Sequence, residues 1–248
     1  MRCKQELMLR SPTLPVDYRR IFLSLFKAGL DRYAGGRYFN EFYGTGQNSD
    51  KNFSFSIALP KGSVFQQKSI HLTQARISMI VSTGDSRTGI LLNNSLLQLR
   101  GYEHPLPDGN AMTVGHLAPM QEPLITGRQI IVQFLSPLCI REHQSGKDRY
   151  ITVADSDFQE QFCRSVAYEL RSKLSGELTP KRISLLPLKM RHTKVLHYNT
   201  YIPVSIGTGV LCGEPEILQA LSQFGVGSRR GSGFGLFRVL SESEVDCL

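Results

Sequence analysis

The groups in this sequence best suited to binding a charged ligand are concentrated in residues 224–240. This segment reads Phe-Gly-Val-Gly-Ser-Arg-Arg-Gly-Ser-Gly-Phe-Gly-Leu-Phe-Arg-Val-Leu, with five glycines and two adjacent arginines. Glycine allows backbone conformations with positive φ and lets another group approach the backbone closely. Arg229 and Arg230 lie among these accessible amides, where an anion would be favoured. The segment therefore predicts an anion-binding loop; the alternative is a flexible connection between a helix and a strand.

The glycine spacing departs from the two common phosphate-binding motifs. Gly225 and Gly227 supply the first two glycines of a dinucleotide fingerprint, but Arg230 occupies the position of the third. A nucleoside-triphosphate loop is also excluded, because no Gly-Lys-Ser or Gly-Lys-Thr follows. We therefore interpret the segment as a basic glycine-rich loop placed between a helix and the terminal strand.

The excess of basic over acidic residues favours a negatively charged partner. The chain of 248 residues carries 29 Lys and Arg against 21 Asp and Glu, a formal net charge of +8. Such an excess attracts phosphate backbones through long-range steering and counterion release. The length is sufficient for one large domain or two of about 125 residues.

Several other protein classes are disfavoured by the composition. No apolar run approaches the roughly 20 residues that span a bilayer, and the N-terminus lacks the apolar core of a signal peptide. The five cysteines are scattered and form no Cys-x-x-Cys pair, so neither a zinc site nor a disulfide framework is predicted. We expect a reduced, cytoplasmic protein with no metal, no cofactor and no membrane contact.

The first half of the chain has alternating and helical patterns in the order β-α-β-β-α-β. Phe53, Phe55, Ile57 and Leu59 alternate with small or polar residues, which is typical of a half-buried strand. The expected elements are a strand at residues 3–9, a helix opened by Pro15, strands at 53–59 and 70–81, a helix at 86–100 and a strand at 112–116. This order predicts a ferredoxin-like domain.

We expect the second half of the chain to repeat this order of strands and helices. A strand at residues 130–134 precedes a helix that begins at a capping box of Ser156 and Gln159 and carries an apolar residue at every fourth position from Phe158 to Leu174. Strands follow within residues 182–206, then a helix from Glu214 to Gly225 and a strand at 236–240. We expect an α+β protein of two tandem ferredoxin-like (RRM-like) domains, residues 1–126 and 127–248, packed side by side.

The glycine pattern of the C-terminal third resembles that of a known family, the CRISPR repeat-processing endoribonucleases of the RAMP superfamily. The resemblance depends on Gly207-Thr-Gly209, Gly213 and the loop 225–235, together with the strand Lys51-Asn-Phe-Ser-Phe-Ser in the first half. It implies tandem ferredoxin-like domains with an RNA-binding cleft between them. It also implies metal-independent cleavage of the CRISPR precursor transcript within its repeats, which releases guide RNAs.

The implied reaction uses the nucleophile that RNA itself carries. The ribose 2′-OH attacks the adjacent phosphate, so the protein must orient the hydroxyl, assist proton transfer and stabilise the developing charge. The products are a 2′,3′-cyclic phosphate and a 5′-hydroxyl end. Many members of the family carry a histidine after the first helix for this purpose, whereas this chain has no histidine before His71.

Lysine, arginine and tyrosine are therefore the catalytic candidates. The candidates are Tyr33, Arg37, Tyr38 and Lys51. Lys51 and Arg37 would stabilise negative charge, and the tyrosines would position the phosphate. Unperturbed Tyr and Lys side chains titrate near pH ~10, so we expect slow catalysis that depends on orientation. The alternative roles are packing or base stacking for the tyrosines, and solvated surface charge for Lys51 and Arg37.

The basic strand and the glycine loop are the candidate RNA contacts. These residues are Lys189, Arg191, His192, Lys194 and His197 in the strand, and Gly227, Ser228, Arg229, Arg230, Gly231, Ser232 and Gly233 in the loop. Strand alternation places Lys189 and Arg191 on one face, opposite His192 and Lys194. Repeat RNA often forms a short hairpin, which a protein recognises through backbone and shape. The remaining histidines, His71, His104, His116 and His143, are expected to be hydrogen-bonded polar residues without a catalytic role.

Two other functions stay open at this point. The chain could be a non-catalytic RNA-binding RAMP subunit that associates with other CRISPR-associated proteins in an interference complex, as the missing histidine suggests. It could also be an unrelated nucleotide-binding enzyme, which would bind a mononucleotide and show no preference for RNA hairpins. The sequence does not decide whether the chain forms a homodimer.

Overall fold

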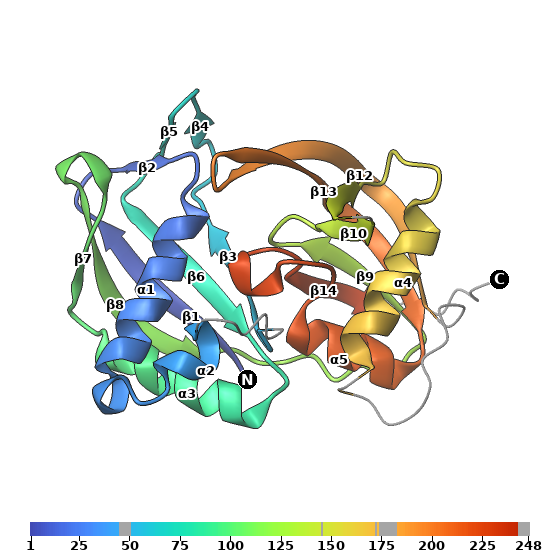
Figure 1. Ribbon diagram of the computed structural model, residues 1–248, viewed down its shortest axis with the longest axis horizontal. Coiled ribbons are helices and arrows are strands. Elements are labelled where there is room, and N and C mark those ends of the chain that lie inside the picture. Colours follow the sequence, from blue (N-terminus) through green and yellow to red (C-terminus); the bar gives the residue numbers. More distant parts are fainter. Residues whose placement is uncertain (45–50, 145, 172, 174–182, 243–248) are drawn as a thin grey trace.

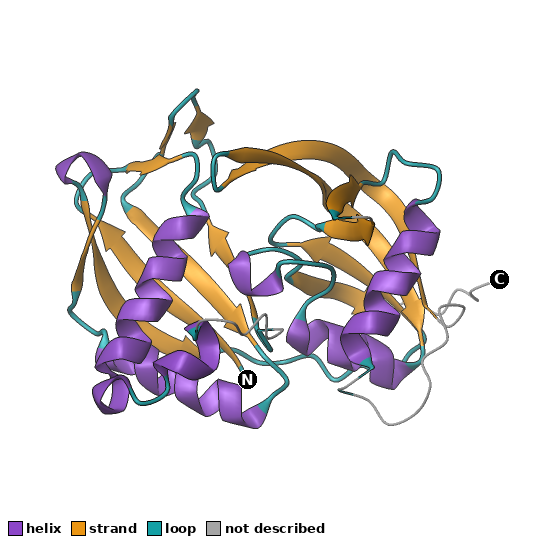
Figure 2. Cartoon of the chain, in the orientation of Figure 1, coloured by secondary structure: helices purple, strands orange, loops and turns teal. Residues whose placement is uncertain are grey.

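A computed structural model describes residues 1–44, 51–144, 146–171, 173 and 183–242. The chain forms two α/β units that lie side by side, each with its principal helices on one face of an antiparallel sheet (Figures 1 and 2). Within these described residues, no helix has the length and apolar character needed to cross a membrane.

The N-terminal unit has the predicted ferredoxin-like order. Its principal elements are β1 (Arg2–Leu9), α1 (Arg19–Arg32), β3 (Ser54–Ala58), β6 (Arg76–Ser82), α3 (Ser86–Gln98) and β8 (Ala111–Pro119). The sheet runs β3-β6-β1-β8, with the short strand β7 (Glu103–Pro105) at the edge beside β8. The prediction for this half is confirmed in element order and in strand pairing.

Aromatic packing joins the first helix to the edge strand β3. The predicted apolar face of α1 is buried, and Phe26 contacts the rings of Phe53 and Phe55 at centroid distances of 5.2 Å each. Helix α3 begins after Asp85, whose carboxylate accepts a hydrogen bond from the Thr88 amide at 2.7 Å. The sequence therefore specifies α1 through the apolar face that it buries. It specifies the start of α3 through the side-chain cap at Asp85.

Two predicted boundaries in this unit are wrong. Pro15 does not open α1, because residues 13–15 form strand β2 (Thr13–Pro15), which pairs with β5 (Ser69–His71). The single strand predicted at residues 70–81 is two strands, since β5 belongs to a small separate sheet with β2 and β4 (Val64–Phe65). Short helices η1 (Tyr33–Gly36), α2 (Phe39–Tyr43) and η2 (Pro107–Gly109) complete the unit.

The C-terminal unit repeats the topology. Its elements are β9 (Gln129–Phe134), α4 (Phe158–Leu170), β12 (Ile183–His197), β13 (Thr200–Gly213), α5 (Pro215–Phe224), η4 (Arg230–Ser232) and β14 (Phe237–Glu242). The sheet order β12-β13-β9-β14 matches that of the first unit, so the predicted duplication is confirmed. A hairpin of β10 (Ile140–Gln144) and β11 (Lys147–Ile151) is inserted between β9 and α4.

Helix α4 starts differently from the prediction. Its N-cap is Asp157, which makes no side-chain capping bond, and the proposed capping box of Ser156 and Gln159 is therefore not formed. The Gln159 amide instead accepts a hydrogen bond from the Leu185 amide of β12 at 3.2 Å. Because the Gln159 side chain is engaged in this tertiary hydrogen bond, it does not form the predicted capping box with Ser156. Leu174, the last residue of the predicted apolar stripe, lies outside the described residues.

The long β12–β13 hairpin arches from the C-terminal unit toward the N-terminal unit (Figure 1). Its turn consists of Tyr198 and Asn199, both with positive φ, of 49° and 62°. At the tip, the Arg20 guanidinium of α1 lies 4.9 Å from the centre of the Tyr198 ring. The hairpin therefore contacts both halves of the molecule.

The end of α5 and the loop after it also contact the N-terminal unit. Arg19 of α1 donates a hydrogen bond to the Gly233 carbonyl at 3.2 Å, and the Ser82 hydroxyl of β6 donates to the Gln223 carbonyl at 2.8 Å. Strand β8 ends at Pro119 and β9 begins at Gln129, so the connection between the units spans residues 120–128. We place the domain boundary within this connection, near Gly127.

The crowding at Gly235 generates a stability prediction. Gly235 has φ of 71°, and a Cβ there would lie 1.8 Å from the Val226 carbonyl oxygen. Gly101 has a similar φ of 79°, but a Cβ there would meet nothing within 4 Å. We expect Gly101→Ala to lower the free energy of unfolding by about 1 kcal/mol and Gly235→Ala by clearly more, measured by urea denaturation. Equal losses in the two variants would contradict the packing described for the loop.

Candidate active-site cleft

The glycines of the loop 225–235 allow it to pack tightly within the protein. Four of them, Gly225, Gly227, Gly233 and Gly235, have positive φ. A Cβ at Gly227 would lie 2.6 Å from the Cys139 carbonyl oxygen, and one at Gly233 would lie 2.9 Å from the Phe55 ring. The close approach predicted from the sequence is thus an approach to neighbouring protein groups.

The two adjacent arginines of the loop point to different environments. Arg230 is 4% exposed, and its Nε lies 3.9 Å from the Glu169 carboxylate. Glu169 also accepts hydrogen bonds from the Gly227 amide at 3.1 Å and the Ser165 hydroxyl at 2.9 Å. The side chain of Arg230, which was predicted as an RNA contact, is therefore largely buried, and it pairs with Glu169 of helix α4.

Arg229 extends toward the surface. Its φ of 62° is unusual for a residue with a side chain and costs of order 1 kcal/mol. The guanidinium donates a hydrogen bond to the Tyr150 hydroxyl at 2.7 Å and lies 3.8 Å from the Asp148 carboxylate. Its side chain is 28% exposed. Of the two arginines, Arg229 is the more exposed.

A cleft of about 740 Å³ lies between the two units. Lys51 contributes from the N-terminal unit, and β10, α4 and the glycine loop contribute from the C-terminal unit. The lining residues are Lys51, Arg141, Glu142, His143, Gln161, Arg164, Ser165, Tyr168, Glu169 and residues 227–232. Such a volume is within the usual range for ligand sites.

Lys51 is a cleft residue whose ammonium group is partly buried. Its ammonium lies 3.8 Å from the centre of the Tyr43 ring, and Gly231 lies so close that a Cβ there would be 2.7 Å from the Lys51 Cβ. Burial, with a smaller contribution from the charge of Lys27, lowers the pKa of Lys51 to about 8. This amine can therefore stabilise a phosphate as a cation and can also transfer a proton near neutral pH.

The other three catalytic candidates lie elsewhere. Tyr33, Arg37 and Tyr38 are not among the residues that line the cleft. The Tyr33 hydroxyl accepts a hydrogen bond from the Asn94 amide of α3 at 3.0 Å, and its ring stacks on Tyr38 at 5.8 Å. The Arg37 guanidinium lies 5.7 Å from the centre of the Tyr38 ring. Tyr33 and Tyr38 thus pack against each other and Tyr33 against α3, whereas Arg37 is exposed.

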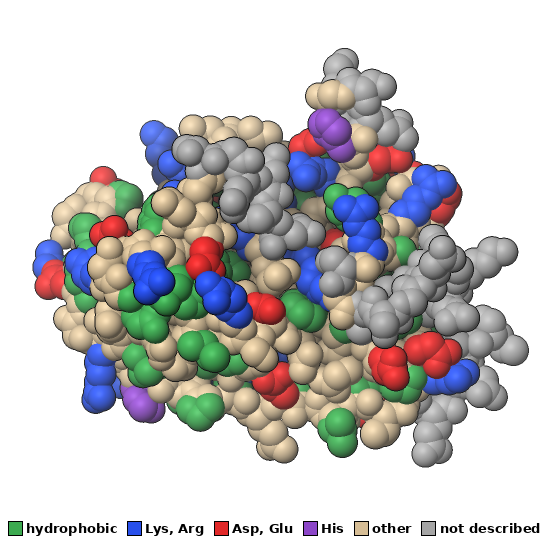
Figure 3. All heavy atoms as spheres, turned by 60° about the horizontal axis from the view of Figure 1, so that its bottom comes forward, with side chains coloured by type: hydrophobic (Ala, Val, Ile, Leu, Met, Phe, Trp, Pro, Cys, Tyr) green, Lys and Arg blue, Asp and Glu red, His purple; other side chains and the backbone are tan. Residues whose placement is uncertain are grey.

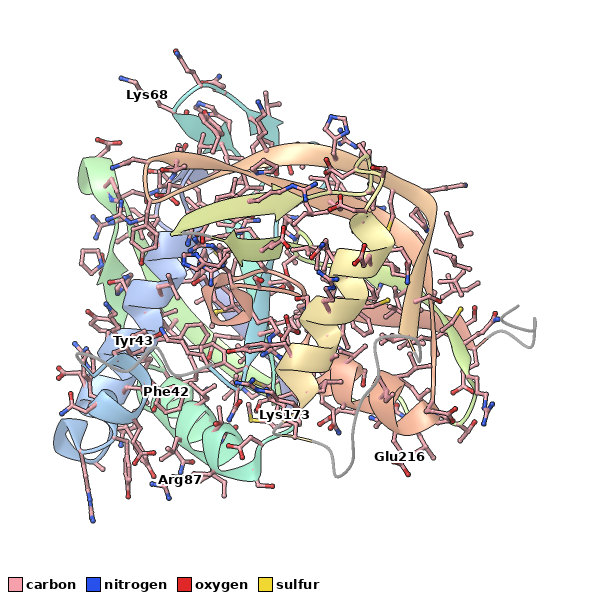
Figure 4. The ribbon with its side chains drawn as sticks, turned by 45° about the vertical axis from the view of Figure 1, so that its right-hand side comes forward. Phe42, Tyr43, Lys68, Arg87, Lys173 and Glu216 are labelled. Atoms are coloured by element: carbon pink, nitrogen blue, oxygen red, sulfur yellow. The ribbon has the colours of Figure 1, made fainter. Side chains whose placement is uncertain are left out.

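Tyr43, which was not among the sequence candidates, is the tyrosine in contact with Lys51. It lies at the end of α2 (Figure 4), and its ring is also 5.0 Å from the Lys27 ammonium. Burial raises the pKa of its hydroxyl. The hydroxyl is buried and makes no hydrogen bond within the described part of the chain. Its aromatic face supports the Lys51 ammonium through a cation–π contact.

The basic residues of β12 divide into an exposed group and one buried histidine. Lys189, Arg191, His192 and Lys194 are exposed. His197 is 2% exposed, and its ring lies between those of Tyr198 and Phe234, at 4.6 and 5.4 Å. Burial and three nearby arginines lower the pKa of His197 to about 4, so it is neutral near pH 7 and packs the hairpin tip.

Positive charge also lies outside the cleft. The face shown in Figure 3 carries Lys and Arg side chains interspersed with Asp and Glu. Within the cleft, Arg141, His143 and Arg164 were missed as candidates. Arg141 and His143 alternate on β10 and so share a face, which is a pattern that the sequence does contain.

Comparisons with known proteins agree with the family indicated by the sequence. Residues 120–239 match the family of CRISPR associated protein Cas6, C-terminal. No curated protein matches the sequence significantly. The predicted resemblance to a family of CRISPR-associated proteins is thereby confirmed for the second half of the chain.

Solved structures share the fold over almost the whole chain. A RAMP protein that binds different RNA substrates superimposes with a TM-score of 0.80 at 18% identity, over 97% of this chain and 100% of that one. A Cas6-related protein from Pyrococcus furiosus gives 0.82 at 18% identity, over 98% and 99%. A product complex of Thermus thermophilus Cas6 gives 0.68 at 16% identity, over 96% and 99%. At these identities the likeness establishes the fold.

The environment of Lys51 predicts unusual reactivity of its amine. With a pKa of about 8, roughly one tenth of the side chain is neutral at pH 7, against well under 0.1% for an ordinary lysine. We expect an acetylating reagent to label Lys51 faster than the exposed Lys61 at pH 7, with a labelling midpoint near pH 8, as followed by mass spectrometry. Lys27→Met should move that midpoint upward, because it removes a neighbouring positive charge. Labelling of Lys51 that begins only near pH 10 would contradict this assignment.

Proposed function

We propose that this protein, whose residues 120–239 match the C-terminal family of CRISPR associated protein Cas6, binds CRISPR repeat RNA and cleaves the precursor transcript within its repeats. The reaction is attack of a ribose 2′-OH on the adjacent phosphate. The 2′-oxygen to phosphorus bond forms and the phosphorus to 5′-oxygen bond breaks, leaving a 2′,3′-cyclic phosphate and a 5′-hydroxyl.

The observation that carries this proposal is the position of Lys51 in the cleft between the two units. A partly buried ammonium with a pKa of about 8 faces guanidinium groups of the opposite wall across a space large enough for part of an RNA strand. In such a partly desolvated site, a fixed positive charge stabilises the developing charge on phosphate more strongly than it would in water. Similarity to structures that bind RNA substrates adds support at the level of fold.

RNA would extend from the cleft along the β12–β13 hairpin. Lys189, Arg191 and Lys194 are exposed on β12 and would contact phosphates, while His192 could contact phosphate or base. Arg229, partly exposed at the cleft, would add a further contact. His197 and Arg230 would support this surface from within the protein.

The alternative is a non-catalytic RNA-binding subunit that works with other CRISPR-associated proteins. One observation favours it: among the described residues of the cleft, the N-terminal wall provides Lys51 and no histidine. Both functions require RNA binding, and they differ in whether the strand is cut.

A cleavage assay separates these functions. Incubation with a panel of synthetic CRISPR repeat RNAs in EDTA should give a single cut in a cognate repeat, with a 2′,3′-cyclic phosphate end. A 2′-deoxy nucleotide at the cut site should abolish cleavage and preserve binding, because only the nucleophile is removed. Binding of repeat RNA without cleavage of any substrate would establish the non-catalytic alternative.

Substitution of Lys51 tests its role in that reaction. Lys51→Ala should lower the single-turnover cleavage rate by about 10²–10³-fold, as expected for loss of one charge-stabilising donor. Binding should weaken by less than about tenfold, because a single phosphate contact is lost. Arg100→Ala, which removes an exposed charge after α3, is the matched control. A Lys51→Ala rate within threefold of wild type would remove Lys51 from the mechanism.

The salt dependence of binding tests the hairpin surface. Each of Lys189→Ala, Arg191→Ala and Lys194→Ala should reduce the slope of log K against log salt concentration by about one unit per lost phosphate contact. Arg100→Ala should leave the slope unchanged. Wild-type slopes in all three hairpin variants would place the RNA on another surface.

A further inference from the structure

A histidine–aspartate pair lies on the cleft wall opposite Lys51. His143 of β10 lines the cleft, and its Nδ1 is 2.8 Å from an Asp148 carboxylate oxygen. The two residues face each other across the β10–β11 hairpin, where they are direct partners in the strand register. A carboxylate at Nδ1 fixes the tautomer and the orientation of the imidazole, so that Nε2 is the nitrogen left to exchange a proton.

Asp148 is itself held by several groups. Arg141 donates a hydrogen bond to its Oδ2 at 3.2 Å, and the Tyr150 hydroxyl lies 3.5 Å from the same oxygen. The Arg229 guanidinium is 3.8 Å away and connects the pair to the glycine loop. Hydrogen bonds from His143 and Arg141 lower the pKa of Asp148, which therefore stays ionised near neutral pH.

The pair of His143 and Asp148 is expected to contribute little to the stability of the fold. The His143 side chain is 64% exposed, and exposed ion pairs contribute little to the free energy of folding. The neighbouring acid, Glu142, lies 3.6 Å from Arg149. An exposed histidine, oriented by a fixed carboxylate and directed to a basic cleft, has instead the arrangement of a general base.

We propose that His143, oriented by Asp148, is the proton acceptor of the RNA cleavage reaction, and that the Lys51 ammonium is the proton donor. This inference rests on the proposed function. His143 Nε2 takes the proton of the 2′-OH as the 2′-oxygen to phosphorus bond forms. Lys51 gives its proton to the departing 5′-oxygen as the phosphorus to 5′-oxygen bond breaks. Water then returns a proton to Lys51 and removes one from His143.

The two roles follow from the chemistry of the two side chains. A neutral imidazole accepts a proton readily near neutral pH, which is the task of the base. Lys51 is mostly protonated at pH 7 and can release its proton more easily than an ordinary lysine, which is the task of the acid. One unit supplies each group, so cleavage would require both walls of the cleft.

The test compares variants on a repeat RNA that the wild-type protein cuts. His143→Ala should lower the single-turnover cleavage rate by about 10²-fold or more, with binding within threefold of wild type. Asp148→Asn should lower the rate less and change its pH profile, which a purely structural role would not do. The control is His116→Ala, which removes an exposed histidine of β8 outside the cleft, with thermal unfolding used to verify that each variant is folded.

A second substrate separates the two proton transfers. When sulfur replaces the 5′-bridging oxygen at the cut site, the leaving group needs no protonation. This substrate should restore cleavage by Lys51→Ala but not by His143→Ala, because the base is still required. Restoration in His143→Ala would overturn its assignment as the proton acceptor.

Each remaining outcome also decides the question. A His143→Ala rate within tenfold of wild type would overturn the role of His143 and leave the proposed function intact. A larger loss without rescue by the sulfur substrate supports the role. Failure of the wild-type protein to cut any repeat RNA would overturn the proposed function, and the catalytic pair with it.

Discussion

The close packing of the glycine-rich loop 225–235 against Phe55 of strand β3 and against Lys51 helps to fix how the two units meet. Gly233 lies against Phe55, and Gly231 lies against Lys51, at distances that leave no room for a Cβ. The same loop directs Arg230 inward to Glu169 and Arg229 outward to Asp148 and Tyr150. One segment therefore sets the position of Lys51, closes the floor of the cleft and orders a network on its opposite wall. The functional geometry depends on this loop more than on either sheet alone.

This arrangement has an electrostatic consequence for the protein without RNA. Lys51 is partly buried beside Lys27, and its pKa is lowered to about 8. A lysine whose pKa is lower in the folded state than in the unfolded state penalises folding below that folded pKa, and the penalty disappears as pH rises from about 8 toward 10.5. A phosphate in the cleft would favour the charged form and so remove part of the penalty. Binding of an anion in the cleft would thus stabilise the folded state relative to the unfolded state.

Local sequence patterns were sufficient to predict the fold but only part of the site. The alternation of Phe53 and Phe55 and the spacing of apolar residues in α1 and α4 predicted the correct elements, because burial on one face dictates such periods. The start of α1 was missed because residues 13–15 pair with β5, a partner more than 50 positions away. Adjacent Arg229 and Arg230 have equivalent sequence contexts, yet Glu169 and Tyr150, distant in sequence, give them different environments. The same limit explains why His197, which is buried, was predicted as an RNA contact and why Tyr43 was overlooked.

The acidic residues of the cleft organise its positive charge. Glu169 accepts a hydrogen bond from the Gly227 amide and lies 3.9 Å from Arg230, so its charge is compensated largely by groups of the protein. Asp148 is shared among Arg141, His143 and Arg229, and it fixes the directions of these side chains. Carboxylates in these positions reduce the net attraction for a polyanion, but they hold the cationic groups in defined orientations. Because catalysis depends on orientation at the reacting phosphate, a cleft of mixed charge suits cleavage better than a uniformly basic surface, which suits binding alone.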